Sequence, residues 1–225
     1  AAVDGYAIER VRFQKPVPLQ AGFALIAEHL AALGRPRTAF CQCELRSPGQ
    51  FTDAGFRAFN ELYVQTLTAW GIFRDGVNPV ARSNVCPEVN QPDEPSLYAF
   101  AYTVPTDDRR TTFAISGSGE SAEGKSNYHD HIVRRGDASP DGMSEKAKFV
   151  LSEMERRMAR FDAGWDEVTA TQVYSVFDYF AVMGEVEARR AALHGLTWHF
   201  ARPPIVDLDF EMDCRRVFHE HVLGE

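Results

Sequence analysis

The first 105 residues carry two different periods of hydrophobic and polar positions. Apolar and polar residues alternate over 5–14, 38–45, 81–89 and 96–104, which predicts four strands. Helical spacing of apolar residues appears over 22–34, where Gly34 ends the pattern, and again from Asp53 to about residue 70. We interpret Asp53 as the cap of this second helix. The predicted order is therefore β-α-β-α-β-β.

The second half of the chain repeats this order. The predicted elements are a strand at 111–119, an amphipathic helix at 144–161, a strand at 166–177, a helix opened by Asp178, and strands at about 196–201 and 207–217. Self-similarity in a fixed order indicates duplicated units. The prediction is an α+β chain of two tandem units, residues 1–105 and 106–225, each a mixed sheet with two helices on one face. The polar stretch at 120–142 is long enough to be a functional loop beside the site.

Composition narrows the function. A formal net charge of −8 opposes binding to phosphate backbones, so we expect no nucleic-acid partner. No apolar run reaches the roughly 18 residues that a membrane helix needs, so we expect no membrane association. The four scattered cysteines, with no leader sequence before them, favour a reducing cytoplasm.

Several motifs occur in the order and spacing typical of the RidA/YjgF family. In the second half these are FAISGSG, GWDEVTATQVYSVFDYF and FEMDCRRV, and in the first half NPVARSNVCPEV. The chain resembles that family over nearly its whole length, and its overall plan is also similar to the longer chorismatases. The resemblance implies chorismate mutase-like units, a homotrimer with sites at contacts between units, and Arg82 as the residue that binds a substrate carboxylate. It implies no metal.

The two predicted units differ in what they lack relative to that family. The first has Arg82 but carries Tyr98 in its final strand, where an acidic residue is expected. The second has Ser116, Gly117 and Glu211 but no arginine at the matching position. We therefore predict one hybrid site to which both units contribute.

The chemistry of this site rests on Arg82 and Glu211. A guanidinium is a planar fork that binds a carboxylate through two hydrogen bonds. The alternative is a surface arginine paired with Glu88. Strand alternation points Glu211 away from its apolar neighbours, where it acts as an acid or base if it faces a cleft and is buried. The alternative is a solvated carboxylate.

Further candidates contribute binding only. Ser116 and Gly117 offer backbone N–H groups to a ligand, or form a plain hairpin turn. The cluster around His129 and His131 has His-x-His spacing, but a substrate-facing histidine or a solvated loop explains it better than a metal. The remaining substrate-binding candidates are Tyr98, Trp198 and His199, of which Trp198 could equally belong to the core.

Three functions remain open at this point. The first is an enamine or imine deaminase, or a related hydrolase, acting without a cofactor on a small unsaturated carboxylate such as a 2-aminomuconate-type intermediate. The second is a chorismatase-like hydrolase, which would use the same arginine and glutamate. The third is a trimer that binds a small ligand without catalysis, because a fold does not fix a function.

Overall fold

The computed structural model describes residues 1–122, 124–125, 127–178 and 180–224. Within these ranges the α-helices are α1 (Leu19–Ala32), α2 (Asp53–Ala69), α3 (Pro140–Met158) and α4 (Phe180–Ala188). The strands are β1 (Tyr6–Pro18), β2 (Phe40–Arg46), β3 (Ala81–Pro87), β4 (Ser96–Pro105), β5 (Phe113–Gly119), β6 (Ala170–Tyr174), β7 (Thr197–His199), β8 (Ala201–Arg202), β9 (Glu211–Arg216) and β10 (His219–Leu223). The predicted α+β class with two mixed sheets is confirmed.

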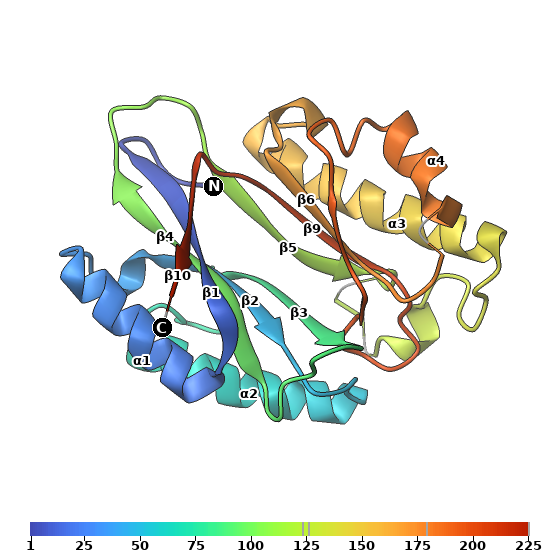
Figure 1. Cartoon of the computed structure of the whole chain (residues 1–225), viewed down its shortest axis with the longest axis horizontal. Helices are drawn as coiled ribbons and strands as arrows, with labels where there is room; N and C mark the ends of the chain where they lie inside the picture. The colour runs from blue at the N-terminus through green and yellow to red at the C-terminus, as the bar shows by residue number, and fades with distance from the viewer. Residues whose placement is uncertain (123, 126, 179, 225) are drawn as a thin grey trace.

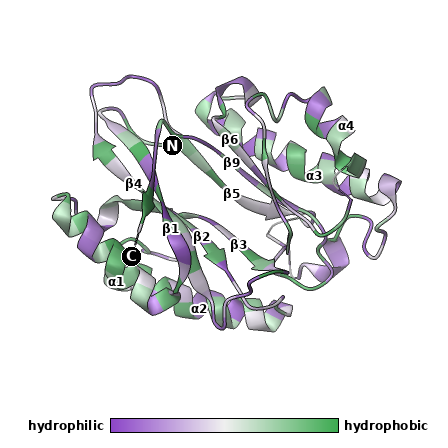
Figure 2. Cartoon of the chain, in the orientation of Figure 1, coloured by the Kyte–Doolittle hydropathy of each residue, from purple (hydrophilic) through white to green (hydrophobic). Residues whose placement is uncertain are grey.

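The strands form two sheets with helices on their outer faces. The larger sheet has the order β10-β1-β4-β2-β3-β8 and the smaller one the order β5-β9-β6-β7. Helices α1 and α2 lie on one side of the molecule and α3 and α4 on the other, with the strands between them (Figure 1). Figure 2 shows apolar and polar residues side by side around these helices, as expected for helices with one buried face.

Each sheet has its own apolar core under its pair of helices. Under α1 and α2 the core includes Phe23, Ile26 and Leu30. Under α3 and α4 it includes Val150 and Met154. These residues hold the predicted helical spacing, and their burial is the main free-energy gain of both helix layers.

The inner faces of the two sheets meet through polar side chains. Arg10 pairs with Glu44 at 2.6 Å, with both side chains buried. Across the gap between the sheets, the Arg46 guanidinium lies 5.5 Å from the ring of Tyr174. On the smaller sheet Tyr174 donates a hydrogen bond to Asp213 at 2.8 Å. The interior between the sheets is therefore a network of charges and hydrogen bonds, unlike the two outer cores.

Several element boundaries differ from the sequence prediction. Helix α3 begins at Pro140, because the Ser139 side chain accepts the Gly142 N–H and Pro140 suits the first helical turn. Thr52, and not Asp53, caps α2. The polar loop after residue 120 is correspondingly shorter than predicted, and residues 123 and 126 of it lie outside the described ranges.

The second half of the chain also contributes to the larger sheet. Strand β10 pairs in parallel with β1, and β8 pairs with β3. The sequence pattern could not predict these pairings, because alternation of apolar and polar residues indicates a strand but not the strand that it pairs with. The division into units 1–105 and 106–225 stays a prediction. Across the described ranges we find no helix with the length and apolar character that crossing a membrane requires.

Candidate active site

A cavity of about 330 Å³ lies where the β3 side of the larger sheet meets the β5 edge of the smaller sheet. Helix α2 and the segment 204–208 complete its walls. The polar residues on the walls are Asn60, Asn78, Arg82, Asn84, Ser116, Ser118, Ser121, Tyr128 and Glu211. One chain thus brings together Arg82, Ser116, Gly117 and Glu211, from both predicted halves, in a single cavity.

Arg82 comes from β3 and turns its guanidinium toward α2. Its Cζ lies 4.9 Å from the ring centre of Tyr63 and 5.4 Å from that of Phe56. Such rings stabilise a cation without neutralising it. Glu88, the partner that a surface arginine would take, instead binds Arg202 at 2.7 Å. Within the described ranges no carboxylate forms an ion pair with Arg82, so its charge is available to an anionic ligand.

Glu211 opens β9 on the face opposite Phe210 and Met212, which lie in the core under α3. Glu211 is only 4% exposed, although it lines the cavity. Burial raises the pKa of Glu211 well above 4.5, and the nearby charge of Asp213 raises it further. These surroundings favour the protonated form of the carboxyl group. A buried carboxyl with a raised pKa on a cavity wall is suited to general acid catalysis.

Ser116 and Gly117 form a bulge in β5, not the plain hairpin turn weighed as an alternative. Between Ile115 and Ser118 the β5–β9 register shifts, so that β5 carries one extra residue. Arg157 of α3 fixes the bulge by donating hydrogen bonds to the carbonyls of Ser116 at 2.6 Å and Gly117 at 3.3 Å. The Ser116 hydroxyl accepts the backbone N–H of Arg82 at 3.3 Å, which ties the bulge to β3.

Two asparagines of the cavity wall have polar atoms with no hydrogen-bond partner among the described residues. The Ser47 hydroxyl donates to Asn84 Oδ1 at 3.0 Å, whereas the buried Asn84 Nδ2 has no partner in the part of the chain that the structure describes. On α2, Asn60 Oδ1 is likewise buried and unpaired. Leaving such atoms unpaired costs free energy, and a ligand in the cavity would recover it. Sequence reasoning missed both residues, although Asn84 lies two positions after Arg82 and so on the same strand face.

Three predicted binding residues lie outside the cavity. Tyr98 faces the polar interior between the sheets, with the Arg46 guanidinium 4.0 Å from its ring centre. His199 stacks on Tyr174 there, with ring centres 4.9 Å apart, and burial lowers its pKa to about 4. Trp198 lies on the edge strand β7 and is 43% exposed. The walls of the cavity do not include these residues, so the structure gives them no contact with a ligand there.

The predicted histidines lie on the surface beside the cavity. His129 and His131 form an exposed 3₁₀ turn, and it is the preceding Tyr128 that lines the cavity. His129 contacts Arg135, and its Nε2 lies 3.7 Å from Asp207. Among the residues that the structure describes, no three His, Cys, Asp or Glu side chains are grouped to hold a metal ion.

The two outer helix layers, the paired sheets and the cavity between them define a chorismatase-like α+β protein. A crystal structure of a chorismatase superposes with a TM-score of 0.57 over 96% of this chain and 76% of that one. The two sequences are 15% identical, so this likeness shows the fold alone. The predicted similarity to the chorismatase plan is confirmed at that level.

A model of the family described as 2-aminomuconate deaminase CnbZ matches residues 1–221. The chain is also 48% identical over 226 residues to 2-amino-5-chloromuconate deaminase from Comamonas testosteroni. That match covers 99% of this chain and 90% of the relative. The chain belongs to the 2-aminomuconate deaminase CnbZ family, and the predicted deaminase class is confirmed at the level of the family.

The sequence-based resemblance to the RidA/YjgF family is wrong. The family that matches is CnbZ, a distinct family, and a solved structure with a similar fold is a chorismatase. The motifs that suggested RidA/YjgF are short strands and turns, which recur in unrelated α+β sequences. The homotrimer inferred from that resemblance stays a prediction. The cavity itself is formed by one chain of 25.2 kDa, and light scattering would give the number of chains.

Proposed function

We propose that this protein removes the amino group of a 2-aminomuconate-type substrate by hydrolysis, releasing ammonia and a 2-oxo acid. The observation that carries the proposal is the presence, in one cavity, of two groups: a guanidinium that has no ion-pair partner among the described residues, and a buried carboxyl whose pKa is raised. Membership of the CnbZ family and the 48% identity to a chloromuconate deaminase support it.

The substrate class suits the walls of the cavity. A muconate has a carboxylate at each end of a flat six-carbon chain, and about 330 Å³ is at the lower end of small-ligand sites. Arg82 binds one carboxylate through its planar fork. Asn84 Nδ2 offers a neutral N–H donor to another oxygen of the substrate. Aliphatic residues of the segment 204–208 pack against the unsaturated carbons.

Glu211 performs the first proton transfer. The substrate is an enamine, in which the amino nitrogen pushes electrons onto the neighbouring carbon chain. Glu211 donates its proton to a carbon of that chain, a C–H bond forms, and the C–N bond becomes a double bond. The product is an iminium ion and the Glu211 carboxylate. Arg82 keeps the reacting chain in place while this happens.

Water then completes the reaction. The Glu211 carboxylate accepts a proton from water as the water oxygen bonds to the iminium carbon, giving an amino alcohol. Glu211 passes this proton to the nitrogen, the C–N bond breaks, and ammonia leaves while the hydroxyl becomes a carbonyl and returns its proton to Glu211. Glu211 ends protonated, as it began. We propose that no cofactor takes part, because the iminium carbon is already electrophilic enough for water.

The test is ammonia release from 2-aminomuconate and 2-amino-5-chloromuconate by the purified protein. We expect Arg82→Ala and Glu211→Gln each to lower kcat/KM at least tenfold. Loss of a general acid typically costs about 10²-fold or more, so Glu211→Gln should have the larger effect. A parallel assay for pyruvate from chorismate addresses the chorismatase-like alternative. Ligand binding without any product would support the non-catalytic alternative and overturn this proposal.

A further inference from the structure

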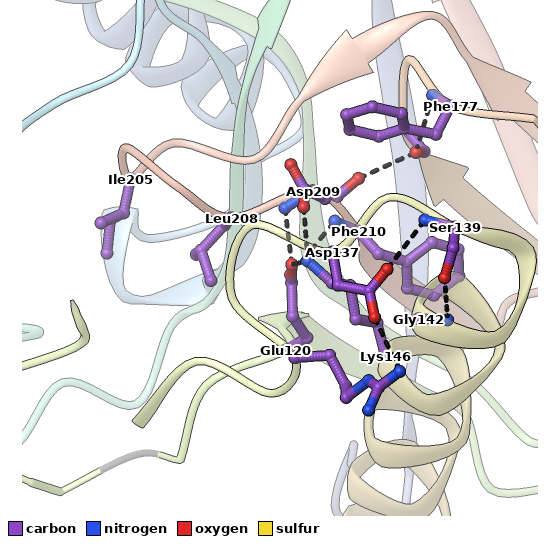
Figure 3. A network of polar contacts seen from close by, with 12 residues as sticks. Glu120, Asp137, Ser139, Gly142, Lys146, Phe177, Ile205, Leu208, Asp209 and Phe210 are labelled. Carbon is purple, nitrogen blue, oxygen red and sulfur yellow. Dashed lines mark hydrogen bonds and ion pairs between the residues drawn. The ribbon is translucent and has the colours of Figure 1, made fainter. Parts of the chain in front are cut away.

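A buried ion cluster lies next to the cavity, and the mechanism above leaves it unused. Lys146 of α3 is fully buried, and its ammonium contacts the carboxylates of Glu120, at 3.3 Å, and of Asp209 (Figure 3). Placing three ionisable groups in the interior costs free energy that their mutual attraction only partly offsets. An apolar residue at position 146 would match the surrounding core, so the cluster is not explained by packing.

The cluster is joined directly to Glu211 through the backbone. Glu120 follows Gly119, and Gly119 is the β5 residue that pairs with Glu211. The Glu120 carboxylate accepts the backbone N–H of Asp209 at 2.6 Å and that of Phe210 at 3.1 Å. These are the two residues before Glu211, so Glu120 fixes the point at which β9 begins.

The same residue also connects two other parts of the cavity wall. The Glu120 carbonyl accepts the N–H of Val133 at 2.8 Å, which attaches the polar loop that carries Tyr128. The segment held by its carboxylate, residues 209 and 210, directly follows Leu208, which lines the cavity. A substitution at Glu120 is therefore expected to displace Glu211, the loop that carries Tyr128, and Leu208 of the cavity wall.

We propose that Glu120 is a positioning residue for the reaction at Glu211. It fixes the position of Glu211 through the two backbone N–H groups that precede it, and it places a negative charge, held by Lys146, near the Glu211 carboxyl. This inference rests on the proposed function, because it assigns the cluster to the same acid. Glu120 does not touch the substrate in this arrangement, since Gly119 and Ser121, its neighbours in the chain, line the cavity and it does not.

The charges around Glu211 give the direction of the effect. The groups that face it are Asp213 from β9, Glu120 at the end of β5, Arg82 and Cys86 from β3, and Arg157 from α3. Glu120 raises the pKa of Glu211, while the two arginines lower it. Burial raises the pKa of Glu120 itself to about 7. Above neutral pH the ionised Glu120 therefore helps Glu211 to keep its proton.

The test compares Glu120→Gln with the wild-type protein. Glutamine keeps the shape and one acceptor oxygen but has no charge. We expect the alkaline limb of kcat/KM, where Glu211 loses its proton, to move to lower pH by about one unit. The matched control is Glu145→Gln, which makes the same change on the exposed side of α3, where Glu145 pairs with Lys148 at 3.1 Å. The control should leave the limb in place.

A second readout does not depend on activity. The infrared C=O band of protonated Glu211, identified by its loss in Glu211→Gln, should disappear at lower pH in Glu120→Gln than in the wild type. An unchanged band and an unchanged limb would overturn the inference, even if the variant were less stable. A wild-type protein without deaminase activity would instead contradict the proposed function, and the band would still decide the role of Glu120.

A second variant covers the case in which Glu120→Gln does not fold. Asp209→Asn removes the other carboxylate from Lys146 and keeps the backbone N–H groups of residues 209 and 210 that Glu120 accepts. The cluster then holds one carboxylate and one ammonium, so the field at Glu211 is less negative. We expect the limb and the band to move in the same direction, by less than in Glu120→Gln. A shift to higher pH would contradict the proposal.

Discussion

Gly117 lies against the carboxyl group of Glu211 so closely that a methyl group on residue 117 would overlap Glu211 Oε1 and lie 3.0 Å from Ser83 Cβ. The bulge in β5 thus brings backbone, and not a side chain, next to the acid. This close approach explains why the bulge contains a glycine, since any other residue would push the carboxyl out of its position.

Gly117→Ala is expected to lower kcat/KM at least tenfold and to destabilise the protein by about 1–3 kcal/mol, because the added methyl group has no free space. Steady-state kinetics and urea unfolding measure the two effects. Gly184→Ala in α4 is the control, since a Cβ there meets no atom within 4 Å. It should keep full activity and, as a helix substitution, stabilise by about 0.5–1 kcal/mol. Equal kinetics in the two variants would contradict the close approach.

Glu211→Gln is expected to lose activity and gain stability at high pH. The folded pKa of Glu211 lies well above its ordinary value of 4.5, so between these two values the folded state holds a proton that the unfolded state has lost. Wild-type stability therefore falls as pH rises through this window. Glutamine has no such proton to lose. The difference in Tm between variant and wild type should grow from pH 5 upward, and a constant difference would refute the raised pKa.

Arg82→Lys separates charge from geometry. Lysine keeps the positive charge beside the rings of α2 but lacks the planar fork, so kcat/KM should fall by about tenfold or more, with Arg82→Ala worse still. Arg202→Lys serves as the control, because that arginine pairs with Glu88 on the surface. The measurement is ammonia release at several substrate concentrations. Full activity in Arg82→Lys would show that a point charge is sufficient.

His199→Asn tests whether the polar interior takes part in the reaction. The substitution removes the stacking on Tyr174 and changes the contact with Gln172 at 3.1 Å. We expect a loss of about 1–2 kcal/mol in unfolding free energy and kcat/KM within about twofold of the wild type. Chemical denaturation and kinetics on the same preparation provide both numbers. A large drop in kcat at unchanged stability would place His199 in the site after all.

Most helices and strands could be predicted from the sequence, because the residues of each outer core recur along the chain with the regular spacing of a helix or a strand. Phe23, Ile26 and Leu30 have the spacing of a helix with one buried face, and that face is where they lie. The hybrid site was also predicted: Arg82 and Glu211 come from different halves and line one cavity. Their catalytic roles stay predictions until the variants are measured.

The remaining features depend on tertiary contacts that a period cannot show. Tyr98 and His199 lie in segments with the alternation of a half-buried strand, which predicts one open face. In the structure that second face of each sheet is covered by the other sheet. Lys146 did give a signal. It falls in the apolar row of α3 that contains Met143 and Val150, where a solvated lysine would not lie. A charge in such a row indicates a buried ion pair.

Strand β10 pairs with β1 across a separation of 210 residues, as the contact between Arg10 and Glu220 shows. A chain emerging from the ribosome therefore presents β1 with one unsatisfied edge until almost all of the sequence described here has been made. Pairing over such a distance carries a high loop-closure cost and slows folding. The larger sheet, which holds Arg82, is thus completed late, and β10 covers an edge of β1 that would otherwise be open to aggregation.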